Sequence, residues 1–67
     1  MKLILKHSAV VFNGGKNSIG QIDKGEHAVR EVEPLDKDGV KWYQFIDTKK
    51  IISLNPNNLP PGIVLVD

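Results

Sequence analysis

Apolar residues occur along this chain in short runs or alternate with polar ones, and glycine, proline and asparagine separate the runs. No window of about eleven residues or more has apolar positions at helical spacing without a glycine or proline inside it. Short segments rich in β-branched and aromatic residues are typical of strands. The pattern predicts five to seven short strands, drawn from the segments Lys2–Lys6, Ala9–Phe12, Ser18–Ile22, His27–Glu33, Val40–Asp47, Ile51–Leu54 and Ile63–Val66.

The segments between the predicted strands are rich in turn-forming residues. Gly25 accepts a positive φ, which a tight turn after the third strand requires. Asp36–Gly39 is expected to form a hairpin turn, and Asn55–Gly62 to be a loop because it holds three prolines. Strands spaced by about eight to ten residues indicate a sandwich or barrel. Because 67 residues are few for a sandwich, we expect one all-β domain over residues 1–67, a small barrel.

Residues suited to catalysis or to metal binding are scarce in this sequence. The absence of cysteine excludes disulfides, thiolate catalysis and cysteine-ligated zinc. His7 and His27 have no catalytic or metal-binding motif around them. Asp36–Gly39 resembles the start of a calcium loop, but residue 47 is aspartate where such a loop ends in glutamate. We therefore expect no enzymatic activity, no metal and no cofactor.

The charge is nearly balanced, with nine basic and eight acidic residues and a net charge of +1. Residues 1–22 hold three lysines and no acid (+3), residues 23–39 three basic and six acidic residues (−3), and residues 40–67 three lysines and two acids (+1). Such a distribution is typical of solvated strand faces or of a bipolar surface that steers a charged partner. The apolar run after Lys2 ends at Lys6, too short for a signal peptide or a membrane span. We expect a cytoplasmic protein with no membrane partner.

Two stretches resemble a known family. Ser18–Glu26 contains a small residue, glycine and a Lys-Gly pair, and Lys41–Phe45 carries a Trp-Tyr pair. Together they resemble the bacterial SH3-like domain family over roughly residues 9–47, with Asp36–Gly39 at the place of the charged hairpin. Lys50–Ser53 stands where the family usually has a Gly-Trp-Val strand. The resemblance implies an SH3-like barrel and, for secreted members, recognition of peptidoglycan or peptides.

Aromatic residues are the best candidates for a binding site. Neighbours on a strand point to opposite faces, so Trp42 and Tyr43 cannot both enter the core, and one of them is expected on the surface. Exposed tryptophan and tyrosine are enriched at binding hot spots, although Trp42 could instead cover one end of the barrel. By resemblance, the tryptophan position belongs to a ligand groove. The basic Asn13–Asn17 turn is expected to touch a ligand. The candidate contact residues are Trp42, Tyr43, Phe12, Lys16, Asn17 and Leu59; Leu59 would either line a groove or plug the barrel end.

We expect this domain to be a binding module that acts by protein–protein interaction. Phage and mobile-element genomes encode many small chains of this kind, some of which inhibit a host protein by occupying its surface. Two alternatives stay open: cell-wall peptidoglycan or peptide binding, and nucleic-acid binding through lysines and stacked aromatic rings. Self-association through the Ile63–Val66 strand is a further expectation, because an edge strand offers unpaired backbone groups.

Overall fold

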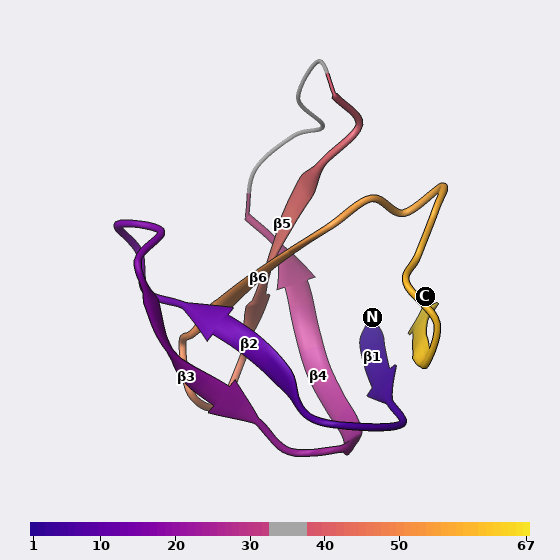
Figure 1. Cartoon of the computed structure of the whole chain (residues 1–67), viewed down its shortest axis with the longest axis horizontal. Helices are drawn as coiled ribbons and strands as arrows, with labels where there is room; N and C mark the ends of the chain where they lie inside the picture. The colour runs from indigo at the N-terminus through magenta and orange to yellow at the C-terminus, as the bar shows by residue number, and fades with distance from the viewer. Residues whose placement is uncertain (33–37) are drawn as a thin grey trace.

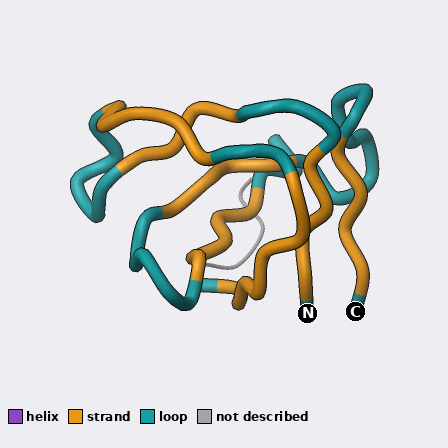
Figure 2. Tube along the Cα trace, turned by 90° about the horizontal axis from the view of Figure 1, so that it is seen from below, coloured by secondary structure: helices purple, strands orange, loops and turns teal. Residues whose placement is uncertain are grey.

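The computed structural model describes residues 1–32 and 38–67, and within these ranges it contains strands and turns and no helix (Figures 1 and 2). The all-β prediction is confirmed. The described strands are β1 (Lys2–Leu5), β2 (Ala9–Phe12), β3 (Ser18–Ile22), β4 (Gly25–Glu31), β5 (Lys41–Phe45), β6 (Ile51–Leu54) and β7 (Ile63–Val66). Of the predicted hairpin turn Asp36–Gly39, residues 36 and 37 lie outside the described ranges.

Three strands, β1, β4 and β5, have bounds that differ from the predicted ones. β1 ends at Leu5 and not at Lys6, β4 ends at Glu31, and β5 begins at Lys41 and not at Val40. β4 begins at Gly25, two residues early, because Gly25 pairs with Leu5 of β1 and so belongs to the ladder and not to a turn. β5 ends at Phe45, because the next residues form a tight turn in which the Phe45 N–H donates to Lys50 O and the Lys49 N–H donates to Phe45 O. Lys49 takes a left-handed conformation there, with φ of 64°.

All strands join one antiparallel sheet in the order β3-β2-β6-β5-β4-β1-β7. The long strand β4 connects its two parts, since residues 25–28 pair with β1 and residues 29–31 pair with β5. Figure 2 shows the strands curling around a common interior. The described pairings leave β3 and β7 as the edges, and no pairing between them is among those the structure describes. A closed barrel therefore stays a prediction.

The core fills the concave side of this curled sheet. Alternate residues of each central strand point inward, which is the periodicity of a half-buried strand. The buried core cluster consists of Leu3, Leu5, Val11, Val29, Tyr43, Phe45, Ile52 and Leu54. Since no helix covers the sheet in the described ranges, the other side of each strand faces outward.

Gly62, in the turn before β7, provides a test of this fold. Its φ is +85°, and a Cβ built on it would lie 2.6 Å from the Nε2 of His7. We expect Gly62→Ala to lower the free energy of unfolding by about 1–2 kcal/mol, since a left-handed conformation costs that much in a residue with a Cβ. Gly14→Ala is the matched control, because Gly14 has open space around it and no positive φ. Equal urea midpoints for the two variants would contradict the expected conformation of this turn.

Candidate partner-binding surface

The outer face of the sheet, defined here as the side of β2, β4, β5 and β6 that points away from the core, carries the candidate residues. The register places their side chains in rows across the strands. Gln44 on β5 pairs with Arg30 on β4 and with Ile51 on β6, and Ile51 pairs with Phe12 on β2. Trp42 lies two residues from Gln44 along β5, on the same face, and is opposite Ser53. Four strands from distant parts of the chain therefore build one surface.

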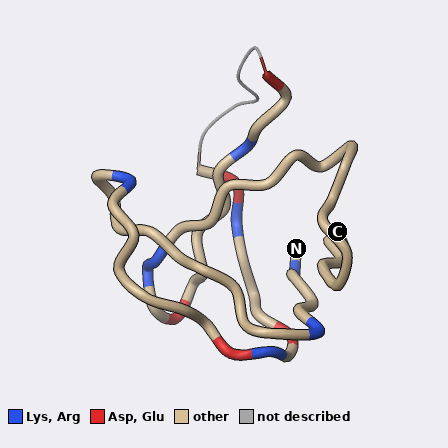
Figure 3. The backbone as a smooth tube through the Cα atoms, in the orientation of Figure 1, with Lys and Arg blue, Asp and Glu red and all other residues tan. Residues whose placement is uncertain are grey.

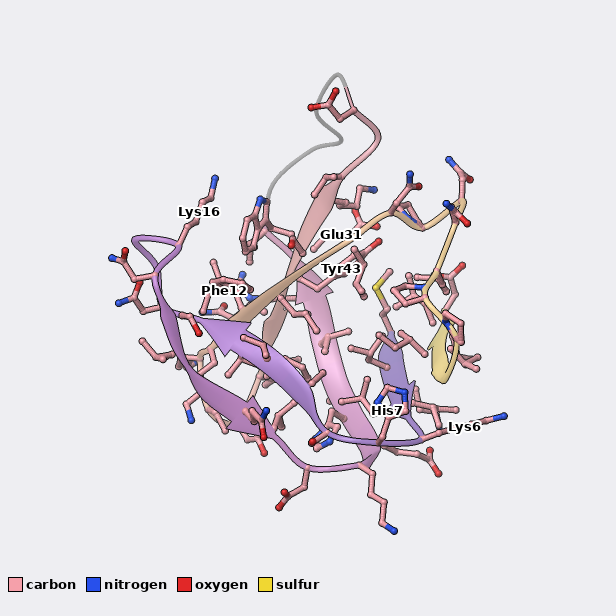
Figure 4. All side chains as sticks on the ribbon, viewed as in Figure 1. Lys6, His7, Phe12, Lys16, Glu31 and Tyr43 are labelled. Atoms are coloured by element: carbon pink, nitrogen blue, oxygen red, sulfur yellow. The ribbon has the colours of Figure 1, made fainter. Side chains whose placement is uncertain are left out.

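Phe12, Lys16 and Trp42 meet on this face and are referred to below as the aromatic corner. The rings of Phe12 and Trp42 pack edge to face, with centroids 5.6 Å apart and an interplanar angle of 85°. The Lys16 Nζ lies 5.0 Å from the centroid of the Trp42 ring, within the range of a cation–π interaction. Figure 4 shows Lys16 reaching from the loop between β2 and β3. Both rings are only half-buried, so part of this corner faces solvent.

The loop that carries Lys16 is a closed hydrogen-bonded turn. The side-chain Oδ1 of Asn13 accepts hydrogen bonds from the Gly15 N–H at 2.9 Å and from the Asn17 N–H at 3.1 Å. The Lys16 N–H donates to Asn13 O, and the Asn13 N–H donates to Asn17 O. Lys16 itself is left-handed, with φ of 62°. These bonds direct the Lys16 side chain back over the sheet, while Asn17 is exposed beside it.

Apolar side chains that face solvent extend the surface beyond the aromatic corner. Val10 precedes Phe12 by two residues on β2, and Val32 follows Arg30 by two residues at the end of β4. Val10, Val32 and Ile46 are 45%, 37% and 48% exposed. Backbone hydrogen bonds tie two of them to the sheet, because the Val32 N–H donates to Trp42 O and the Ile46 N–H donates to Ala28 O. The outer face is therefore apolar over a wider area than the aromatic rings alone.

A polar group crosses the centre of the outer face. The Nε and Nη2 atoms of Arg30 donate to the Oε1 of Gln44 at 2.9 and 2.7 Å, and the Nε2 of Gln44 donates to Lys49 O at 3.1 Å. This network ties the Arg30 side chain on β4 to Gln44 on β5. Figure 3 shows basic and acidic residues interspersed over the described chain. The surface thus combines an apolar area with a few fixed cations.

Tyr43 does not belong to this surface. The expectation that it contacts a partner is corrected by its burial, since it is 1% exposed and packs in the core. Alternation along β5 is the reason: Tyr43 pairs with Ile52, which points inward, and its neighbour Trp42 points outward. The end of β5 near Tyr43 also carries an ion pair between Lys41 Nζ and Glu31 Oε1 at 3.1 Å.

Leu59 is also separate from the aromatic corner. It is half-buried and packs against the core cluster, as a residue that plugs one end of the sheet would. In Figure 1 the segment 55–62 runs to the opposite side of the molecule from the loop between β2 and β3. Of the six candidate residues, the structure therefore brings together Phe12, Lys16 and Trp42, with Asn17 at the margin.

The environment of Tyr43 predicts an unusual titration. Burial raises the pKa of its phenol, Lys41 opposes the rise, and Glu31 and Asp67 add to it. The folded state thus favours the neutral phenol. Its contribution to stability is complete below the unfolded pKa of about 10 and is lost as the pH rises through the higher folded value. Because the chain has a single tyrosine, the ultraviolet absorbance of its ionised phenol should show a higher titration midpoint for the folded chain than for the chain in urea. Coincident midpoints would refute this environment for Tyr43.

The two histidines lie apart and contact backbone carbonyls. His7 Nδ1 is 3.2 Å from Ser8 O, and His7 Nε2 is 3.3 Å from Pro61 O. His27 Nε2 donates to Asp23 O at 2.8 Å, and its ring packs edge-on against Phe45. Within residues 1–32 and 38–67 no group of three or more metal-ligating side chains comes together. In the same ranges no helix has the length and apolar character needed to cross a membrane.

Comparisons of this chain with protein-family models, with curated proteins and with solved structures find no match. The resemblance to the bacterial SH3-like family therefore stays a prediction from residues 9–47.

The contact between Phe12 and Trp42 can be tested by fluorescence, because Trp42 is the only tryptophan. We expect Phe12→Ala to shift the Trp42 emission to longer wavelength and to increase its quenching by acrylamide, since one side of the indole becomes accessible to water. Val10→Ala, on the same strand and face, is the matched control and should leave the emission unchanged. A spectrum of Phe12→Ala that coincides with that of the wild type would show that the rings do not touch in solution.

Proposed function

We propose that this domain is a non-enzymatic module that binds another protein through the outer face around the aromatic corner. The observation that carries the proposal is the solvent-facing pair of Phe12 and Trp42 with Lys16 over the indole. Aromatic residues are enriched at the centre of protein interfaces, where they supply most of the binding energy. The exposed apolar side chains around them supply area that a partner would remove from water.

A protein fits this surface better than a nucleic acid does. The exposed side chains of Val10, Val32 and Ile46 cannot bind phosphate groups, because they are apolar. The net charge of +1 gives little of the electrostatic attraction on which nucleic-acid binding depends. An apolar surface that also holds a few cations suits a partner with apolar side chains and some acidic residues. Lys16 and Arg30 would meet those acidic residues.

The mode of action follows from the absence of a catalytic constellation in the proposed site. The aromatic corner holds no nucleophile beside a base, so we propose that the domain acts on its partner by occupying a surface. Inhibition or modulation of that partner is the expected consequence. The lack of cysteine fits a reducing compartment, and we place the encounter in the cytoplasm.

A peptide selected on the immobilised domain tests where binding occurs. A displayed library of random peptides gives the probe, and nitrogen-15 chemical shifts of the labelled chain map its contacts. We expect the largest changes at Val10, Phe12, Lys16 and Trp42, and none at Val64 on the far strand β7. Shifts confined to β7, or a library that yields no binder, would contradict the proposal.

The same labelled chain separates the alternative ligands. A single-stranded DNA oligonucleotide that shifts these residues, with an affinity that falls steeply with salt, would replace the proposal by nucleic-acid binding. Co-sedimentation with purified peptidoglycan at low salt, in competition with the selected peptide, would replace it by cell-wall binding. We expect neither ligand to compete with the peptide.

A further inference from the structure

The edge strand β7 offers a second interaction surface, on a different part of the molecule. Among the residues that the structure describes, β7 pairs with β1 only, and the Lys6 N–H donates to Gly62 O at 2.9 Å. In an antiparallel ladder the residues that face the neighbouring strand alternate, so Gly62, Val64 and Val66 turn their backbone groups toward β1. The Val29 N–H donates to Met1 O, so the odd-numbered residues of β1 turn their backbone groups toward β4. The even-numbered residues of β1 therefore turn theirs toward β7, which agrees with this assignment.

The remaining residues of β7 therefore turn their backbone groups outward. These are Ile63, Leu65 and Asp67. The Ile63 N–H donates to Pro60 O at 3.2 Å, which leaves its carbonyl for a further strand. The outward groups are thus Ile63 C=O, Leu65 N–H and C=O, and Asp67 N–H. They have the spacing with which an antiparallel strand bonds to a further strand.

The side chains of β7 do little to prevent pairing. The strand contains no charge, proline or glycine between Ile63 and Val66, although natural edge strands usually carry such protection. Val64 and Val66 are exposed by 42% and 36% on its outer side. The opposite edge strand differs, because β3 contains Gly20, and its register with β2 shifts between Val11 and Phe12. Such irregularity and glycine both weaken edge pairing.

We infer that β7 pairs with β7 of a second copy of this chain, antiparallel across a two-fold axis at Leu65. This register joins the two Leu65 residues by two reciprocal hydrogen bonds and brings each Asp67 N–H to Ile63 C=O of the other copy. It also sets Val64 of one copy beside Val66 of the other on the outer side. β-Branched cross-strand pairs of this kind stabilise sheets, and each valine covers the other.

Charges at the two ends of β7 favour a second copy as the occupant. Lys6 is exposed beside the first end, as Figure 4 shows, and Asp67 is exposed at the last end. Antiparallel pairing brings Asp67 of each copy toward Lys6 of the other, whereas parallel pairing would place the two aspartates together. The surface is thus complementary to itself, as a two-fold interface requires. The short contact predicts weak association, with a dissociation constant of about 10 μM to 1 mM.

Sedimentation velocity on the full chain from about 10 μM to about 2 mM tests this inference across the expected range. We expect a monomer–dimer equilibrium. Val64→Lys combined with Val66→Lys should abolish the dimer, because four like charges would face one another. Val64→Lys combined with Val66→Glu should restore it, because each introduced lysine would face an introduced glutamate. Ile46→Lys, an equally exposed position on the outer face, is the matched control and should dimerise like the wild type.

Amide hydrogen exchange identifies the strand involved. Exchange at Leu65 and Asp67 should slow as the protein concentration rises, while Val64, bonded to β1, should be protected at every concentration. A chain that stays monomeric at the highest concentration would overturn the inference. A dimer that persists in the variant with Val64→Lys and Val66→Lys would also overturn it, as would a dimer that is lost in Ile46→Lys. A monomer that binds only a strand of another protein at β7 would overturn it as well. Because β7 lies outside the aromatic corner, the result of this experiment does not decide whether a peptide binds at Trp42.

Discussion

Replacing Phe45 with alanine is expected to remove most or all of the stability of the domain. The side chain is completely buried, and it packs against the ring of His27, with centroids 5.5 Å apart. Truncation of a buried phenylalanine costs about 3–5 kcal/mol, through lost burial and the cavity left behind. A chain of 67 residues has only about 3–10 kcal/mol of total stability. No disulfide supplies a reserve, since the sequence lacks cysteine.

The adjacent position gives the control for this prediction. Ile46 follows Phe45 directly but faces solvent, so Ile46→Ala should change the free energy of unfolding by less than about 0.5 kcal/mol. Urea denaturation followed by circular dichroism compares both variants with the wild type. A Phe45→Ala variant with an unchanged midpoint would show that the core lies elsewhere.

Trp42→Ala is expected to weaken binding of the selected peptide by at least about 30-fold, which corresponds to about 2 kcal/mol and is typical of a hot spot. The substitution removes the indole that both Phe12 and Lys16 contact, so the whole aromatic corner loses its centre. Trp42→Phe should recover part of the affinity, because it restores an aromatic face without the full area. Isothermal titration calorimetry measures both variants.

Loss of binding must be separated from loss of the fold. Trp42 lies outside the buried core cluster, so we expect the Trp42→Ala chain to keep the dispersed amide spectrum of the wild type and to unfold cooperatively. Val64→Ala removes an exposed apolar side chain on β7 and should bind the peptide as the wild type does. Wild-type affinity in a folded Trp42→Ala chain would remove the aromatic corner from the site.

Local pattern predicts most of this fold from the sequence. β2, β3, β6 and β7 have the predicted bounds, because each is a short apolar or β-branched run between turn residues. The start of β4 could not be predicted, since Gly25 belongs to the strand only through its pairing with Leu5. Lys-Gly is a turn signal by itself, and this contact between residues twenty apart overrides it.

The candidate site could be predicted only in part. Alternation places Trp42 and Tyr43 on opposite faces but does not say which of them is inside. That depends on the pairing of Tyr43 with Ile52, an inward residue of β6. The contact of Lys16 with Trp42 depends on a turn closed by Asn13 and on the pairing of Phe12 with Ile51, both invisible to a local pattern. Val10 could have been found, because alternation along the strand places it on the same face as Phe12, which is already a candidate contact residue. The sequence offers no comparable signal for the Arg30–Gln44 network.

Capture of partners from a lysate of the organism that encodes this chain tests the proposed site most directly. The wild type, Trp42→Ala and Val64→Ala are immobilised at equal density, and the retained proteins are quantified by mass spectrometry. The proposal predicts one or more proteins that the wild type and Val64→Ala retain equally and that Trp42→Ala loses. Retention of the same proteins by all three chains, or of none above empty beads, would contradict it.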